Sequence, residues 1–105
     1  MPLSKKELLD VSFTLGEFDP SVDGAYRNVK TFLINVRPGT LFVSVASDRP
    51  VDIAISNSDG ICIKFKDSIL CDTLTAETPK KEAVTLFAGV YRGDKAELRI
   101  KAWMG

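Results

Sequence analysis

The fold is decided by the stretch that runs from Arg37 to Gly60, which reads RPGTLFVSVASDRPVDIAISNSDG. Apolar residues occupy every second position on both sides of a break at Pro50, a residue that has no N–H to donate to a neighbouring strand. They are Leu41, Val43 and Val45 before the break, and Val51, Ile53 and Ile55 after it. A period of two is typical of strands that bury one face. The stretch therefore predicts two strands, 40–47 and 51–56, with a turn at either end.

The same alternation continues along the rest of the chain. It predicts further strands at about 11–18, 26–37, 61–66, 69–74, 83–88 and 95–103. Turn-forming residues separate these runs, and no amphipathic run of ten residues interrupts the series. The sequence therefore predicts an all-β fold, an antiparallel two-sheet β-sandwich that is jelly-roll-like and has about eight strands. A length of 105 residues fits a single domain over 1–105.

The first ten residues do not follow the alternation. Ser4 followed by Glu7 matches the capping box of a helix N-terminus, and Leu8 and Leu9 would then pack against the sheet. We therefore expect a short helix over 1–10 that packs on the sandwich.

Alternation also predicts which side chains face the core. In the run 61–66, we expect Ile61, Ile63 and Phe65 to face inward, and Cys62, Lys64 and Lys66 to face outward. In the last run, we expect Ala96, Leu98, Ile100 and Ala102 inside, and Glu97, Arg99, Lys101 and Trp103 outside.

The composition argues against several functions. The chain holds 14 basic and 14 acidic residues, so its formal net charge of zero provides no field to attract nucleic acid or an anionic membrane. It contains no histidine, the commonest general base and metal ligand. We therefore expect a protein that is not an enzyme and that uses no cofactor and no metal.

The location in the cell is predicted from the absence of targeting signals. No apolar run approaches the ~20 residues of a membrane-spanning helix, and residues 1–10 lack the apolar core of a signal peptide. A cytoplasmic protein without membrane insertion is the expectation, and a domain cropped from a secreted protein is the alternative.

Two cysteines, Cys62 and Cys71, are too few for a disulfide framework. If a turn centred on Lys66 and Asp67 joined their two strands, they would face each other and would form a cross-strand disulfide in an oxidising compartment. In a reducing cytosol they would be free thiols, which is the reading we favour.

Two acidic segments and one tripeptide have the composition of ligand sites. Asp19 and Asp23 are spaced too widely for a calcium loop, and the residues 57–60 are explained by a hairpin turn. The tripeptide Arg92-Gly93-Asp94 matches an integrin-binding motif, yet it also suits an ordinary turn. We interpret all three as turns.

The aromatic residues expected on or near an outer face are Trp103, Tyr91 and Phe42. An exposed aromatic ring stacks on a sugar or anchors a protein contact. The competing interpretation is that the N-terminal segment or a long loop covers these rings. They are the ligand- or partner-binding candidates of this sequence.

The order of these motifs resembles a known family. An aromatic residue at Tyr26 is followed by the run from Phe32 through Gly60, and the end of the chain brings Leu86-Phe-Ala-Gly-Val-Tyr91. Over residues 26–105 this progression resembles the pre-peptidase C-terminal (PPC) domain, and more loosely the GOLD domain. The resemblance implies a small jelly-roll-like sandwich that is non-catalytic and binds proteins, polysaccharide or membrane-associated partners. Some relatives bind calcium through acidic clusters, but no such cluster lies on matching residues here.

Three functions remain open on the sequence alone. The first is a non-enzymatic interaction module that uses an outer sheet face or an edge strand to bind a protein partner or a second copy of itself. The second is a structural subunit of a larger homo-oligomeric assembly. The third is a binder of carbohydrate or of another small ligand.

Overall fold

The computed structural model describes residues 6–16, 28–91 and 94–105. These residues form six strands and no helix. The strands are β1 (Lys6–Leu15), β2 (Val29–Val36), β3 (Gly39–Ser56), β4 (Cys62–Thr78), β5 (Glu82–Gly89) and β6 (Ala96–Met104). The all-β, antiparallel prediction is confirmed.

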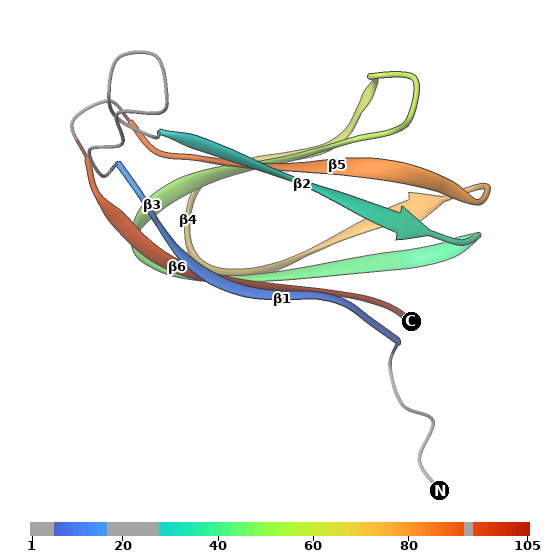
Figure 1. Cartoon of the computed structure of the whole chain (residues 1–105), viewed down its shortest axis with the longest axis horizontal. Coiled ribbons are helices and arrows are strands. Elements are labelled where there is room, and N and C mark those ends of the chain that lie inside the picture. The colour runs from blue at the N-terminus through green and yellow to red at the C-terminus, as the bar shows by residue number, and fades with distance from the viewer. Residues whose placement is uncertain (1–5, 17–27, 92–93) are drawn as a thin grey trace, which may run out of the picture.

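All six strands of the described residues belong to one hydrogen-bonded sheet, in the order β1-β6-β3-β5-β2, with β4 along the other side of β3. The first half of β3 pairs with β6, from Leu41 to Ser47, and its second half pairs with β5, from Asp52 to Ser56. Figure 1 shows the result: β1 and β6 lie on one side of the molecule, β2 and β5 on the other, and β3 passes between the two. The expected two separate sheets are therefore one bent sheet that nearly closes on itself.

The long strands β3 and β4 explain why six strands are found where about eight were expected. The predicted strands 40–47 and 51–56 are the two halves of β3, and 61–66 and 69–74 lie within β4. Pro50 falls between Ala46 and Val51, where the register with β4 shifts. In β4 the corresponding bend lies at Ser68, whose φ of 54° is left-handed. The breaks in the sequence therefore mark bends within strands rather than loops between them.

The two ends of the sheet, β1 and β2, meet through side chains. The rings of Phe13 and Phe32 lie 5.3 Å apart at 58°. The ammonium group of Lys30 lies 5.4 Å from the centre of the Phe13 ring and 5.7 Å from that of Phe32, distances at which a cation is attracted to an aromatic face. These contacts cover the seam that the hydrogen bonds leave open.

One hydrophobic core fills the space inside the bent sheet. Its largest fully buried side chains come from five of the six strands, because every second residue of each strand points inward. They are Leu15, Val36, Leu41, Val43, Val45, Val51, Ile53, Ile55, Val84, Leu86 and Ile100.

The expected N-terminal helix is wrong for the residues that the structure describes. Lys6 to Asp10 belong to β1 and pair with β6, while residues 1–5 lie outside the described residues. The two adjacent leucines that suggested a helix face lie instead at an irregularity between Glu7 and Leu9, where one extra residue on β1 interrupts the register. The described residues include no helix that is long and apolar enough to cross a membrane.

The expected facing of residues 61–66 is confirmed for Ile63, which packs against the core, and for Cys62, which is exposed, but it is wrong for Ile61 and Phe65. Phe65 lies opposite Ala54 and is 59% exposed, and Ile61 is 61% exposed. Lys64 and Lys66 lie opposite the buried Ile55 and Ile53, because a register shift of one residue exchanges the two faces of a strand. Lysines that point inward from an edge strand hinder pairing with another chain. The inversion leaves apolar side chains on the outer surface of this half of the sheet.

Candidate functional site

The candidate site lies on the outer side of β1, β6 and the first half of β3, which we call the β6 face. Residues directly opposite each other in antiparallel strands point to the same side of the sheet. The pairs that share this face join Glu7, Asp10, Ser12 and Thr14 of β1 to Trp103, Lys101, Arg99 and Glu97 of β6. Of these β6 residues, Trp103, Lys101 and Arg99 pair in turn with Phe42, Ser44 and Ala46 of β3, and Glu97 is hydrogen-bonded to Asp48 of β3.

Phe42 and Trp103 are direct cross-strand partners at one end of this face. Their rings are stacked, with centroids 5.6 Å apart and planes only 7° from parallel, and both side chains are half-buried. A shallow hollow of about 450 Å³ adjoins the pair and is lined by Glu7, Ser44, Lys101 and Trp103. An aromatic surface, a carboxylate, an ammonium group and a hydroxyl therefore surround one space.

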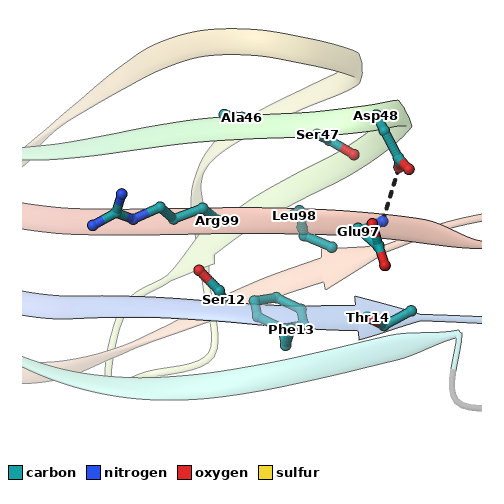
Figure 2. A pocket seen from close by; sticks show the side chains of 9 residues that line it. All are labelled: Ser12, Phe13, Thr14, Ala46, Ser47, Asp48, Glu97, Leu98 and Arg99. Atoms are coloured by element: carbon teal, nitrogen blue, oxygen red, sulfur yellow. Dashed lines mark hydrogen bonds between the residues drawn. The ribbon is translucent and has the colours of Figure 1, made fainter.

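A second shallow hollow, of about 610 Å³, lies at the other end of the β6 face (Figure 2). Its polar lining includes Ser12 and Thr14 of β1, Glu97 and Arg99 of β6, and Asp48 of β3. The Asp48 carboxylate accepts a hydrogen bond of 2.8 Å from the Glu97 N–H, which fixes the edge of the hollow. Figure 2 shows the Arg99 side chain extending along β6, away from Glu97.

An ion pair between Asp10 and Arg99 lies between the two hollows. Arg99 donates two hydrogen bonds to the Asp10 carboxylate, of 3.1 Å from Nε and 3.0 Å from Nη2. This fork geometry matches a carboxylate well. Hydrogen bonding to Arg99 is the largest effect on Asp10 and lowers the pKa of its carboxyl group, and the same contact raises the pKa of Arg99. Both groups are therefore held in their charged forms.

The charges of the β6 face restrict what can bind there. Four carboxylates, those of Glu7, Asp10, Asp48 and Glu97, accompany two cations, Arg99 and Lys101. This excess of negative charge disfavours a polyanion such as nucleic acid. The β6 face also carries hydroxyl groups beside these ionised side chains, and this combination suits a ligand rich in hydrogen-bonding groups.

The structure brings two of the three aromatic candidates together. Trp103 and Phe42 form the stacked pair, and Trp103 lies on the outer side of β6 as alternation predicted. Tyr91 is 74% exposed beyond the end of β5 and lines neither hollow of the β6 face. The acidic partners Glu7 and Asp10 were not recognised from the sequence, because the segment that carries them was interpreted as a helix.

The cysteines do not face each other. Cys62 and Cys71 lie on the same strand, β4, opposite Ser56 and Ala46 respectively, and both are free and exposed. The hairpin that would have brought the thiols together is instead a bend within β4. The cross-strand disulfide expected for an oxidising compartment does not form in this arrangement.

The remaining sequence motifs add no ligand site in the described part of the chain. Asp19, Asp23, Arg92 and Gly93 lie outside the described residues. The Asn57 side chain accepts hydrogen bonds of 3.0 Å from the N–H groups of Asp59 and Ile61, which accounts for the turn at residues 57–60. Within the described residues, no group of three or more acidic or cysteine side chains is placed to hold a metal ion.

Comparisons with known proteins give structural likeness alone. No family model and no curated protein matches the chain, so the resemblance to the PPC and GOLD domains stays a prediction. A de novo designed double-stranded β-helix, solved by NMR, is 13% identical with a TM-score of 0.49, and the match covers 90% of this chain and 97% of that one.

Two mutants of a family 29 carbohydrate-binding module also match. One, made to probe ligand recognition, is 11% identical with a TM-score of 0.38, covering 91% of this chain and 86% of that one. The other is 10% identical with a TM-score of 0.37, covering 90% and 92%. Likeness at this level carries no argument about what this chain binds.

Proposed function

We propose that this protein is a non-enzymatic binding module that holds a carbohydrate on its β6 face. The observation that carries the proposal is the hollow beside the stacked Trp103 and Phe42 rings, where Glu7, Lys101 and Ser44 converge. A sugar ring presents apolar C–H groups on its faces and hydroxyl groups around its rim. An aromatic surface binds the first, and charged side chains bind the second with strong hydrogen bonds.

The two hollows together suit an elongated ligand rather than a single sugar. They lie at opposite ends of β6, and the six residue steps from Glu97 to Trp103 span roughly 20 Å at the rise of a β-strand. The Asp10–Arg99 pair lies between them, with carboxylate and guanidinium atoms available for further hydrogen bonds at the surface. We therefore expect an oligosaccharide that follows β6 to bind more tightly than a monosaccharide.

The carboxylate in the middle of the face, Asp10, fits binding better than acid catalysis. Hydrolysis of a glycosidic bond requires a pair of carboxyl groups, one of which has a raised pKa so that it donates a proton. On the β6 face, the hydrogen bonds from Arg99 lower the pKa of Asp10, which makes it a poorer acid at neutral pH. Asp10 therefore fits a hydrogen-bond acceptor for the ligand.

The test uses intrinsic fluorescence, because Trp103 is the one tryptophan of the sequence. We expect titration with oligosaccharides selected on a glycan array to change the intensity or the wavelength of its emission, with saturation. The Trp103→Ala variant, followed by calorimetry, should lose binding. A Tyr91→Ala variant is the matched control, since Tyr91 is an exposed aromatic residue outside both hollows, and it should bind normally. Absence of binding to any glycan, or full binding by Trp103→Ala, contradicts the proposal.

A further inference from the structure

The second outer surface of the protein differs sharply from the β6 face. It is formed by β2, β5, the second half of β3 and the start of β4, and we call it the β5 face (Figure 1). Among the described residues that the register places on this face, Asp52 is the one that carries a charge. The large side chains of Val29, Leu33 and Phe65 are 54%, 77% and 59% exposed there. Apolar surface with few charges is typical of the centre of a protein–protein contact.

The β5 face contains a slot between two aromatic rings. Phe65 of β4 lies opposite Ala54 of β3, and Ala54 lies opposite Phe87 of β5, so the three side chains form one row across the sheet. The outer two strands of this row are roughly 10 Å apart, twice the spacing of neighbouring strands. The small side chain of Ala54 leaves the middle open, and a hollow of about 260 Å³ results, with Val29, Asp52, Gly89 and Val90 also lining it. Its size suits one aliphatic side chain.

The same face carries a side chain that fits such a slot. Leu33 of β2 lies opposite Thr85 and is the most exposed large apolar residue in the described part of the chain. It lies two strands from Ala54 and two residues along from the row of the slot, a separation of roughly 12 Å. Leu33 and the slot therefore point the same way from one surface of one molecule.

We propose that the β5 face pairs with the β5 face of a second copy of this chain, with each Leu33 inserted between Phe65 and Phe87 of the other copy. Consider a two-fold axis that lies in the plane of the interface and runs along the perpendicular bisector of the line from Leu33 to Ala54. Rotation about this axis places Leu33 of each copy over Ala54 of the other, so both insertions occur together. Such isologous contacts require a self-complementary surface. A face on which the register places one charged residue, on a protein of zero formal net charge, brings little electrostatic repulsion to the pairing.

The small area of the face is typical of a weak, reversible association. Four strands about 4.8 Å apart and seven residues at about 3.3 Å per residue give a patch of roughly 15 by 20 Å. This is smaller than the roughly 800 Å² that each partner buries in a standard interface. We therefore expect a reversible dimer whose population rises with concentration.

The experiment is sedimentation velocity of the full chain over a concentration series. We expect the weight-average sedimentation coefficient of the unmodified protein to rise toward that of a dimer. Leu33→Glu should raise the dissociation constant about 30-fold or more, the effect of removing an interface hot spot. The matched control is Leu70→Glu, which makes the same change at a leucine of β4 that is 51% exposed, does not line the slot and is not placed on the β5 face by the register. It should dimerise normally.

A second variant separates insertion from general hydrophobic adhesion. Ala54→Leu adds apolar surface but fills the slot of its own molecule. Insertion of Leu33 predicts that this variant dimerises more weakly than the unmodified protein, whereas adhesion between apolar surfaces predicts equal or stronger dimerisation. Circular dichroism should show the same strand content for all three variants.

Three results would overturn the proposal: a monomer at every concentration up to ~1 mM, a dimer that persists in Leu33→Glu, or equal or stronger dimerisation of Ala54→Leu. The inference does not depend on carbohydrate binding, because the β5 face shares no residue with the two hollows of the β6 face. The Trp103 fluorescence of Leu33→Glu should respond to sugar as in the unmodified protein, so the two proposals succeed or fail separately.

Discussion

Arg99 of β6 donates two hydrogen bonds, of 3.1 and 3.0 Å, to the carboxylate of Asp10 on the neighbouring strand β1. One guanidinium group therefore links the side chains of β6 and β1. The pair is solvent-exposed, and exposed ion pairs contribute little to stability on average. Its two-point geometry is the reason to expect a measurable effect here.

The stability contributed by Asp10 should depend on pH. The hydrogen bonds from Arg99 lower the pKa of Asp10 in the folded protein below the ordinary value of an aspartate, so the contribution is present above that ordinary value and is lost as the pH falls through the lower folded value. We expect Asp10→Asn to lower the unfolding temperature at neutral pH and to differ little from the unmodified protein near pH ~2. Differential scanning calorimetry at both pH values tests this. An equal difference at the two pH values would assign the effect to something other than the charge of Asp10.

The middle of the core should be sensitive to truncation. Ile53 is fully buried in the second half of β3, which has neighbours on both sides. Ile53→Ala should lower the free energy of unfolding by about 2–5 kcal/mol, through lost burial and the cavity left behind. Thr73→Ala, at an exposed position of β4, is the control and should cost less than about 1 kcal/mol. Urea denaturation measures both, and similar losses would contradict the assigned facing.

Two glycines with left-handed backbones should respond differently to alanine. Gly16 has a φ of +86°, and a Cβ atom there would collide with the backbone carbonyl of Asp94. Gly60 has a φ of +80°, but a Cβ atom there would have no neighbour within 4 Å. Gly60→Ala should therefore cost only the strain of the left-handed conformation, about 1–2 kcal/mol, and Gly16→Ala clearly more. Chemical denaturation of the pair provides the comparison, and equal costs would mean that the contact with Asp94 is readily relieved.

Both thiols should react in the native protein. Cys62 and Cys71 are free and exposed at separate positions of β4. A colourimetric thiol reagent should therefore titrate two groups per chain in buffer, the same number as in denaturant. Replacement of each cysteine by serine should leave the unfolding midpoint nearly unchanged, because neither side chain fills the core. A titration of fewer than two native thiols would contradict the placement of these residues.

The sequence predicted those parts of the fold in which local pattern and tertiary position agree. The run 83–88 became β5, and 95–103 became β6 with Trp103 on the outer side, because alternating burial is strong in both. Pro50 correctly marked a disturbance, but a proline at a register shift bends a strand without ending it.

The facing of β4 and the full set of candidate-site residues could not be predicted, because they depend on the register between strands, and the sequence of a single strand does not encode its register. Lys64 and Lys66 face inward because β4 lies at an edge, where long cationic side chains reach solvent from either side of the sheet. The same inversion placed Phe65 outside, opposite Ala54, and so created the slot of the β5 face. Likewise, Glu7 and Asp10 join the candidate site only through pairing with residues more than eighty positions away.

The antiparallel pairing of β1 with β6 has a mechanical consequence. The register runs from Lys6 opposite Met104 to Leu15 opposite Ala96, so the N-terminal end of β1 lies beside the C-terminal end of β6. A force that pulls these two ends apart would break the hydrogen bonds between β1 and β6 one residue pair at a time, starting at that end. It would not act on many of these hydrogen bonds at once. The first pair to separate would be Lys6–Met104 and the next would be Glu7–Trp103, so tension on the chain would reach the aromatic end of the β6 face before its other end.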